Sequence, residues 1–240
     1  MVVAHSERAT LRVGDTFLKV DSDPALSDRE VAAMALAPVP TPEVLWHRPP
    51  VLALAAVRGA ALGVLGEPSP ASSAAWVATG AMVRTLHEAP LPPWPAKDLD
   101  GLRERLEAEA AWLAGSGLLA PELVERNRRA AEVALQPRPP VFAHGDLQLT
   151  HVFVVGDEVT GVLDWSEGGP GDPLFDLATL TLGHEERLDE VLEGYGGDVD
   201  EEVVRGWWAW RSLIASRWLL EHGFDPDTPG AELDVLRAVR

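Results

Sequence analysis

The residues most able to do chemistry lie in the second half of the chain. An apolar run ends at His144-Gly145-Asp146, where the Gly-Asp pair predicts a sharp turn that exposes a carboxylate. His151 follows at the start of the next apolar run, and Asp164 comes at the end of the run after that. A carboxylate that accepts a hydroxyl proton, beside a carboxylate and an imidazole that hold a divalent cation, provides the chemistry of phosphoryl transfer.

Two of the apolar runs, residues 152–155 and 159–163, are predicted to pair as a β-hairpin around a Gly-Asp turn. The residue before the first strand of a hairpin and the residue after the second strand lie at the same end. His151 and Asp164 are therefore expected to be close together. Asp146, on the loop that leads into the hairpin, is expected to point to the same place.

The elements that would position these residues fall into two groups. Short apolar runs separated by turn residues predict strands near the N-terminus, and helical spacing dominates afterwards. The predicted strands are residues 2–5, 9–13, 15–20, 43–47 and 51–57. The predicted helices are residues 27–36, 72–88, 99–113, 122–135, 174–182, 186–193, 201–221 and 231–239.

This order of elements indicates an α+β fold. A small N-terminal antiparallel β-sheet lobe is expected over residues 1–58, and a larger, mainly helical lobe over residues 59–240. The cleft between two such lobes is the expected ligand site.

The first helix is predicted to begin at Ser27. Ser27 and Glu30 have the spacing of a capping box, in which the two side chains satisfy main-chain N–H groups at a helix start. Pro38, Pro40 and Pro42 are expected to end this helix.

Composition restricts the partners. The chain has 240 residues, with 20 Lys and Arg against 38 Asp and Glu, for a formal net charge of −18. A nucleic-acid partner is not expected, because its phosphates require a basic surface. The charge favours cationic ligands at long range, and it is equally well explained by solubility. The absence of cysteine excludes disulfides and thiolate zinc sites.

The expected location is the cytoplasm. Cysteine-free chains suit a reducing compartment. The sequence has no apolar run long enough to span a bilayer and no segment typical of a secretory signal at its N-terminus. A membrane partner is therefore not expected. The sequence does not determine the oligomeric state.

Four motifs that follow one another in the second half of the chain give it a specific resemblance. They are His144-Gly145-Asp146, Leu163-Asp164-Trp165, Gly171-Asp172-Pro173 and Asp176-Leu177-Ala178. Their order and spacing resemble those of the aminoglycoside-phosphotransferase and choline-kinase-like family, whose fold is a variant of the protein-kinase fold. The resemblance is strong over residues 144–178. It extends more weakly over nearly the whole chain, where the order of the lobes agrees.

The resemblance implies a role for each matching residue. Asp146 matches the catalytic base that orients and deprotonates the acceptor hydroxyl, and Asp164 matches the ligand of the Mg²⁺ ion that bridges the phosphates. Lys19 matches the phosphate-binding lysine, and Glu30 matches its ion-pair partner. Asp176 matches an acid that braces the catalytic loop from behind.

The resemblance also places the nucleotide base and the second metal ligand. Main-chain groups of Ala55 and Val57 would pair with the base, and Ser6 lies where a phosphate-covering loop is expected, although this turn lacks glycine. His151 stands where the family has Asn. Neutral imidazole binds divalent metals, but Mg²⁺ prefers oxygen. A preference for Mn²⁺, a metal held by Asp164 and water alone, and weakened catalysis all stay open.

The implied activity is transfer of a phosphoryl group from ATP or GTP, with Mg²⁺ or Mn²⁺, to a hydroxyl of a small molecule. The acidic charge favours an amine-bearing acceptor such as an aminoglycoside or a related antibiotic, and a small metabolite alcohol is the close alternative. Two other classes stay open. One is a nucleotide-binding protein with little transfer activity, suggested by His151. The other is a metallohydrolase built on the His and Asp residues of the segment 144–164, against which the predicted Lys19–Glu30 pair argues.

Tryptophans of the predicted helix 201–221 have two interpretations. Their flat faces suit stacking on a sugar, whereas large aromatic side chains most often pack in a core. We expect most of the four to be core residues: Trp207, Trp208, Trp210 and Trp218.

Overall fold

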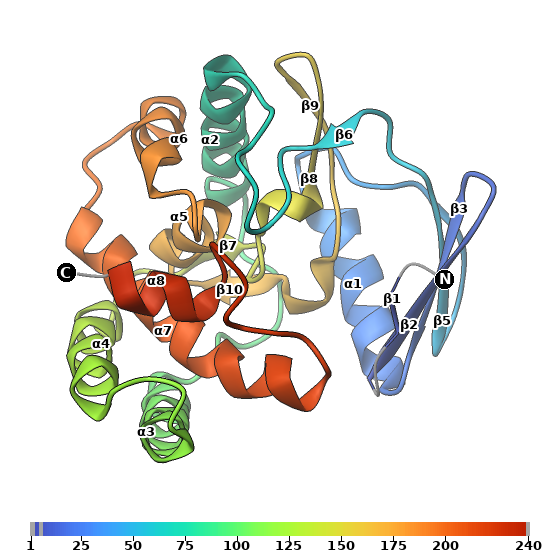
Figure 1. Ribbon diagram of the computed structural model, residues 1–240. Coiled ribbons are helices and arrows are strands. Elements are labelled where there is room, and N and C mark those ends of the chain that lie inside the picture. The colour runs from blue at the N-terminus through green and yellow to red at the C-terminus, as the bar shows by residue number, and fades with distance from the viewer. Residues whose placement is uncertain (1–2, 5–6, 239–240) are drawn as a thin grey trace.

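The computed structural model describes residues 3–4 and 7–238, and it consists of two parts (Figure 1). The first is a five-stranded antiparallel sheet accompanied by one helix, and the second is mostly helical with two small sheets. The predicted α+β architecture, with a small N-terminal sheet lobe followed by a helical lobe, is confirmed.

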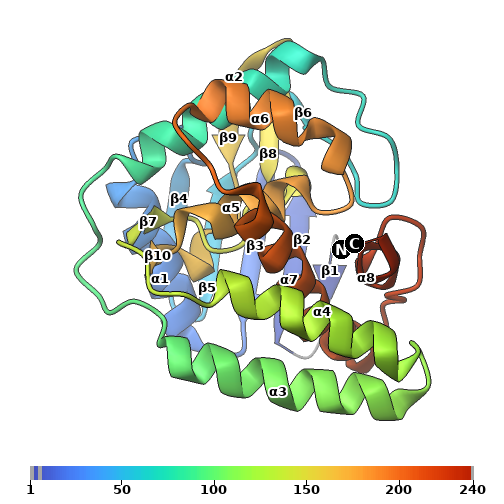
Figure 2. The same ribbon diagram turned by 90° about the vertical axis from the view of Figure 1, so that its left-hand side faces the viewer.

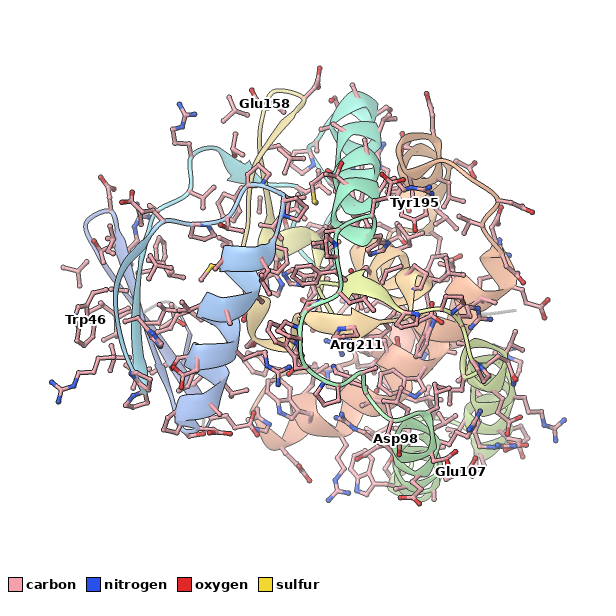
Figure 3. All side chains as sticks on the ribbon, turned by 180° about the vertical axis from the view of Figure 1, so that it is seen from behind. Trp46, Asp98, Glu107, Glu158, Tyr195 and Arg211 are labelled. Atoms are coloured by element: carbon pink, nitrogen blue, oxygen red, sulfur yellow. The ribbon has the colours of Figure 1, made fainter. Side chains whose placement is uncertain are left out.

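The N-terminal lobe is the sheet of order β1-β2-β3-β5-β4 together with helix α1. Its elements are β1 (Val3–Ala4), β2 (Arg8–Val13), β3 (Thr16–Asp21), α1 (Pro24–Leu36), β4 (Val44–Arg48) and β5 (Val51–Ala55). The two-residue turn between β2 and β3 pairs Val13 with Thr16, and the register continues until Arg8 lies opposite Asp21. Trp46 of β4 points outward from the sheet, away from the helical lobe (Figure 3).

The predicted start of α1 at Ser27 is wrong. Asp23 is the N-cap, and its Oδ1 accepts the Ala25 N–H at 2.9 Å. Pro24 follows at the first helical position, where the N–H that proline lacks would have no helical acceptor. Ser27 is buried inside the first turns, and its hydroxyl donates to Pro24 O at 2.9 Å. Glu30 therefore has no capping role.

The C-terminal lobe is arranged around its longest helix, α7. The helices are α2 (Ser73–His87), α3 (Leu99–Ser116), α4 (Pro121–Ala134), α5 (Pro173–Thr181), α6 (Leu188–Tyr195), α7 (Glu201–Glu221) and α8 (Glu232–Ala238). All were predicted, and α7 has the predicted bounds. Helices α3, α4, α5 and α8 pack against α7, and α3 and α4 run side by side (Figure 2). Within the described ranges, no helix is long and apolar enough to cross a bilayer.

The C-terminal lobe also contains two small sheets. The first has the order β6-β8-β9 and contains β6 (Ala60–Ala61) and the predicted hairpin of β8 (Val152–Val155) and β9 (Glu158–Val162). The second pairs β7 (Val141–Ala143) with β10 (Gly169–Gly171). Short 3-10 helices are η1 (Leu149–His151) before β8, η2 (Trp165–Glu167) between β9 and β10, and η3 (Glu185–Arg187) before α6. Helix α1 packs on η2, so this turn is one place where the lobes touch.

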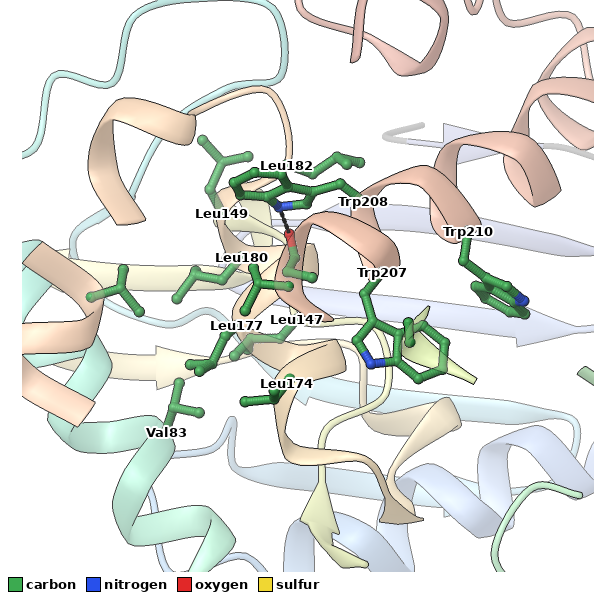
Figure 4. Packing of buried hydrophobic residues seen from close by; sticks show 14 of the residues in the cluster. Val83, Leu147, Leu149, Leu174, Leu177, Leu180, Leu182, Trp207, Trp208 and Trp210 are labelled. Carbon is green, nitrogen blue, oxygen red and sulfur yellow. Dashed lines mark hydrogen bonds between the residues drawn. The ribbon is translucent and has the colours of Figure 1, made fainter. Parts of the chain in front are cut away.

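Three of the four tryptophans of α7 belong to the core. Trp207, Trp208 and Trp210 are buried, and Trp208 donates its indole N–H to Ala178 O at 2.9 Å (Figure 4). A buried indole is accommodated when its N–H finds an acceptor. Trp218, near the end of α7, is only half-buried.

Helices α2 and α6 approach each other closely at two glycines. A Cβ atom on Gly80 would lie 2.1 Å from Val191 O, and one on Gly194 would lie 1.8 Å from Val77 O. No side chain fits at these distances without moving main chain. The packing of α6 on α2 therefore requires glycine at both positions.

Gly80→Ala is expected to lower the free energy of unfolding by about 1–3 kcal/mol, because the added methyl group overpacks the contact. This loss arises although alanine is the better helix former by about 1 kcal/mol. Gly115→Ala in α3 is the matched control, since its Cβ would meet nothing within 4 Å, and it should raise stability by up to about 1 kcal/mol. Urea unfolding followed by tryptophan fluorescence measures both, and equal effects would contradict the prediction.

Candidate active site

The loop that follows β7 is held from behind by Asp176. This residue of α5 is fully buried, and its carboxylate accepts the main-chain N–H of His144 at 2.7 Å and of Gly145 at 2.8 Å. Two bonds to consecutive N–H groups fix the main chain that presents Asp146. The contacts are those expected of the bracing acid.

Asp176 is itself held by a second layer of hydrogen bonds. His87 Nε2 lies 3.1 Å from its Oδ2, and His87 Nδ1 lies 3.0 Å from the Tyr195 hydroxyl. Burial raises the pKa of Asp176, but His87, His144 and the Gly145 N–H outweigh burial and hold the pKa below its ordinary value. The carboxylate is therefore ionised, and its bonds to the loop are charge-assisted.

Gly145 can be replaced by no other residue without strain. Its φ is +80°, and a Cβ atom there would lie 2.5 Å from Glu167 O. The missing side chain lets the loop carrying Asp146 pass directly against the turn that follows Asp164.

His144 is a structural residue. It is fully buried, its Nε2 donates to Leu163 O at 2.9 Å, and its Nδ1 accepts the Asp146 N–H at 3.3 Å. Burial lowers the pKa of His144, so the imidazole is neutral. Because both nitrogens are engaged, His144 has no lone pair for a metal, and the metallohydrolase hypothesis loses a ligand that it requires. In the described part of the chain, no three His, Cys, Asp or Glu side chains are grouped as a metal site would need.

The hairpin brings His151 to Asp164 as predicted. The main-chain O of His151 accepts the Leu163 N–H at 2.9 Å, and His151 Nδ1 lies 2.9 Å from the main-chain O of Asp146. A carbonyl oxygen only accepts, so Nδ1 carries a proton. In the neutral imidazole, Nε2 then has a free lone pair that can bind a metal.

Asp164 has strained backbone geometry. Its φ is 63°, and it is the one non-glycine residue with positive φ among those described. Strain of this kind clusters at functional sites, where the surrounding structure holds it in place. The Oδ1 of Asp164 accepts bonds from Arg8 Nη1 at 2.7 Å, Lys19 Nζ at 3.1 Å and Ser166 Oγ at 3.2 Å.

The predicted ion pair of the N-terminal lobe is present. Lys19 and Glu30 are buried, and Lys19 Nζ lies 2.7 Å from both carboxylate oxygens of Glu30. The same ammonium group reaches Asp164, so the β3 lysine joins the α1 acid to the end of the β8–β9 hairpin.

Arg8 was not predicted as a site residue. Its Nε lies 2.5 Å from Asp21 Oδ1, while its Nη1 bonds Asp164. The sequence does indicate the pairing of Arg8 with Asp21, because a two-residue turn at Gly14-Asp15 sets the β2–β3 register and places these residues opposite each other.

The charges at Asp164 favour its ionised form. Burial raises the pKa of Asp164, but the positive charges of Lys19 and Arg8 and the hydrogen bond from Arg8 outweigh burial and hold the pKa far below the usual range of a carboxyl. Its Oδ2 has no donor among the described residues, whereas Oδ1 has three. One ionised oxygen and His151 Nε2, completed by phosphate oxygens and water, fit Mg²⁺ or Mn²⁺.

The carboxylate of Asp146 faces a cavity of about 670 Å³. Gln148 Nε2 donates to its two oxygens at 3.0 and 3.1 Å, and Arg211 Nη2 of α7 lies 3.6 Å from Oδ1. Arg211 is seen near β7 and β10 in Figure 3, and these strands also line the cavity. A molecule in this cavity could place a hydroxyl against Asp146.

The cavity has an aromatic wall and paired charges. The aromatic residues are Phe175, Trp207, Trp210 and Trp218. Each acidic residue of the lining has a basic partner: Lys97 with Glu167 at 2.6 Å, Arg138 with Asp172 at 3.1 Å, and Arg211 with Asp146 at 3.6 Å. Arg105 also lines the cavity and has no ion-pair partner in the described ranges. The lining therefore carries no excess of negative charge.

The predicted base-binding residues lie at the end of β5. The Ala55 N–H already donates to Glu43 O at 2.9 Å, so only its carbonyl is left for a ligand. The Val57 N–H has no acceptor among the described residues, and its side chain packs on Gly161. Ser6, predicted to cover the phosphates, lies outside the described residues.

Solved structures of similar fold include antibiotic phosphotransferases. The GDP complex of aminoglycoside 2'-phosphotransferase-IIIa aligns with a TM-score of 0.70 over 98% of this chain and 90% of that one, at 17% identity. Aminoglycoside phosphotransferase APH(3'')-Id from Streptomyces rimosus, solved with ADP and streptomycin, gives a TM-score of 0.64 over 84% and 87%, at 24% identity. Macrolide 2'-phosphotransferase MphH from Brachybacterium faecium gives a TM-score of 0.62 over 97% and 88%, at 20% identity. The fold is thus that of kinase-like phosphotransferases, as expected.

The sequence itself gives the family. The model of the phosphotransferase enzyme family matches residues 7–213, which is most of the chain, and the protein belongs to this family. It is therefore a small-molecule phosphotransferase. The resemblance to aminoglycoside phosphotransferases and choline-kinase-like proteins is confirmed.

The neutral, buried His144 predicts a loss of stability in acid. Its pKa is lowered from the ordinary value of 6.5, so below about pH 6.5 the unfolded chain binds a proton that the folded protein does not. The contribution of neutral His144 to the free energy of unfolding is therefore complete above that pH and is lost as the pH falls. In urea unfolding between pH 8 and pH 5, His144→Gln should reduce the pH slope of the unfolding free energy by up to about 1.4 kcal/mol per pH unit. Identical slopes in variant and wild type would contradict the prediction.

Proposed function

We propose that this protein transfers the γ-phosphoryl group of ATP or GTP to a hydroxyl group of a small molecule. In this proposal, residues 1–58 bind the nucleotide, and residues 59–240 carry the catalytic residues and the acceptor site. The observation that carries it is the meeting of Lys19 Nζ with Asp164 Oδ1 at 3.1 Å, beside a loop whose Asp146 faces an open cavity. The GDP and ADP complexes of structural neighbours support nucleotide use.

Asp146 is the proposed catalytic base. Its carboxylate accepts the acceptor's hydroxyl proton as the hydroxyl oxygen bonds to the γ-phosphorus. The bond from that phosphorus to the bridging oxygen breaks, and the products are a phosphate ester and a nucleoside diphosphate. Gln148 and Arg211 orient the carboxylate through the contacts at its two oxygens. Lys19, fixed by Glu30, neutralises charge on the phosphates.

The proposed metal ligands are Asp164 and His151. The groups that remain free for this purpose are Asp164 Oδ2 and His151 Nε2. A bound Mg²⁺ or Mn²⁺ ion neutralises charge on the phosphate oxygens as a Lewis acid. At the hinge, the Ala55 carbonyl and the Val57 N–H are the proposed partners of the base, and Ser6 is the proposed cover of the phosphates.

The acceptor is proposed from two sets of charges. The net charge of −18 favours an amine-bearing molecule, such as an aminoglycoside or a related antibiotic, because it attracts cations at long range. The lining of the cavity supports a second candidate. Because its acids are paired and an aromatic wall is present, a less charged acceptor with an apolar body, including a metabolite alcohol, also fits.

The decisive variant is Asp146→Asn, which keeps the size of the side chain and removes its basicity. With ATP or GTP, Mg²⁺ and a panel of aminoglycosides, macrolides and amino alcohols, the acceptor-dependent release of nucleoside diphosphate should fall by about 10²–10⁴-fold. Asp189→Asn, on an exposed face of α6, is the control and should keep the wild-type rate. Unchanged turnover in Asp146→Asn would refute the assignment. Nucleotide binding by the wild type without turnover on any acceptor would favour a nucleotide-binding protein instead.

A separate prediction concerns His151, the proposed metal ligand that stands where the family has Asn. His151→Asn replaces an imidazole nitrogen with an amide oxygen, which Mg²⁺ prefers. The ratio of the turnover rate with Mg²⁺ to that with Mn²⁺ should therefore increase in this variant. A ratio equal to that of the wild type would show that His151 does not determine the choice of metal.

A further inference from the structure

A second cation of the N-terminal lobe occupies the place where phosphates are proposed to bind. The Arg8 side chain is 15% exposed, and its guanidinium group joins Asp21 at 2.5 Å to Asp164 at 2.7 Å. Its Nη1 and the Lys19 Nζ bond the same oxygen, Asp164 Oδ1. Arg8 therefore stands beside the lysine that the proposed function assigns to the phosphates.

Neutralising Asp21 does not account for the position of Arg8. The cross-strand contact through Nε already balances that carboxylate with a single charge. The guanidinium nevertheless extends from the sheet to a carboxylate that lies 156 residues away in sequence and belongs to the other lobe. Around it, Asp21, Glu30 and Asp164 supply three negative charges against the two positive charges of Arg8 and Lys19.

We propose that Arg8 is a second phosphate-binding residue of the nucleotide site. This assignment rests on the proposed function. On binding, Nη1 of Arg8 exchanges Asp164 for a phosphate oxygen and Nη2 can bond a second one, while Nε stays on Asp21 and holds the side chain in the cleft. A guanidinium fork matches the geometry of phosphate, and its charge is permanent. The sequence between β1 and β2 has no glycine, so a cationic side chain takes over part of the work of a glycine-rich phosphate-binding loop.

The exchange has a consequence for Asp164. When Arg8 moves onto the phosphates, Asp164 Oδ1 loses its shortest hydrogen bond. The carboxylate then has more of its charge available to a divalent cation. Arg8 thereby couples the arrival of phosphates to the release of the proposed metal ligand.

The test compares ligands that differ only in the number of their phosphate groups. Wild type and Arg8→Gln are titrated with nucleoside, mono-, di- and triphosphate of the adenosine and guanosine series in metal-free buffer with EDTA, by isothermal calorimetry. Arg8→Gln should weaken di- and triphosphate binding on the order of tenfold and leave nucleoside binding within about twofold. Arg8→Lys, which keeps the charge without the fork, should lie between.

The control is Arg12→Gln on the same strand. Arg12 is exposed, and its Nε donates to Gly14 O rather than into the cleft. This variant should bind every ligand as the wild type does. Arg8→Gln leaves Asp21 buried without its partner. The double variant Arg8→Gln/Asp21→Asn removes both charges, and we expect it to lose affinity for the same ligands by the same factors as Arg8→Gln.

The outcomes separate the two proposals. A loss that is equal for nucleoside and triphosphate, or no loss at all, assigns Arg8 to the neutralisation of Asp21 and overturns its phosphate role alone. A wild-type protein that binds neither nucleotide series overturns the proposed function and this assignment with it. A loss that grows with the number of phosphates in both the single and the double variant supports Arg8 as a phosphate ligand.

Discussion

The carboxylate of Asp164 is the point at which the two lobes meet. One of its oxygens accepts bonds from Arg8 and Lys19, which lie on neighbouring strands of the N-terminal sheet. Each of these cations brings its own acidic partner, Asp21 or Glu30, so the lobes are joined by a network of alternating charges. Removing one partner of such a network is costly, because it leaves a buried charge without compensation. The relative position of the sheet and the β8–β9 hairpin depends on this arrangement.

The other half of the site is organised by main-chain bonds. Ionised Asp176 holds the N–H groups of His144 and Gly145, and His87 and Tyr195 extend this network to α6. The loop that presents Asp146, the proposed catalytic base, is thus held by the core of the large lobe, whereas the groups proposed to meet the nucleotide are held by side-chain charges. The first arrangement is rigid, because buried N–H groups have no other acceptor. The second can rearrange, because a phosphate oxygen can replace a carboxylate oxygen.

Local patterns predicted most of the fold and the centre of the site. Two-residue turns set the strand registers, which is why the closeness of His151 to Asp164 and the strand position of Lys19 followed from the sequence. The start of α1 was mispredicted because Asp23-Pro24 and Ser27 are competing helix-start signals, and local sequence does not rank them. Strand β10 consists of Gly-Pro-Gly, which has no strand propensity and is held only by pairing with β7. The contact of Arg8 with Asp164 and the lining of the cavity join segments far apart in the chain, so only the three-dimensional structure shows them.

The paired charges around the cavity determine how a single substitution changes the charge of its lining. Losing one basic member, Lys97 or Arg138, leaves its carboxylate partner unpaired and lowers the net charge of the lining by one. Neither base forms an ion pair with Asp146 or with the Lys19–Glu30 pair, so the change leaves those contacts in place. In the proposed function, a change at Lys97 or Arg138 would alter which acceptors the cavity favours without replacing any residue of the loop that carries Asp146.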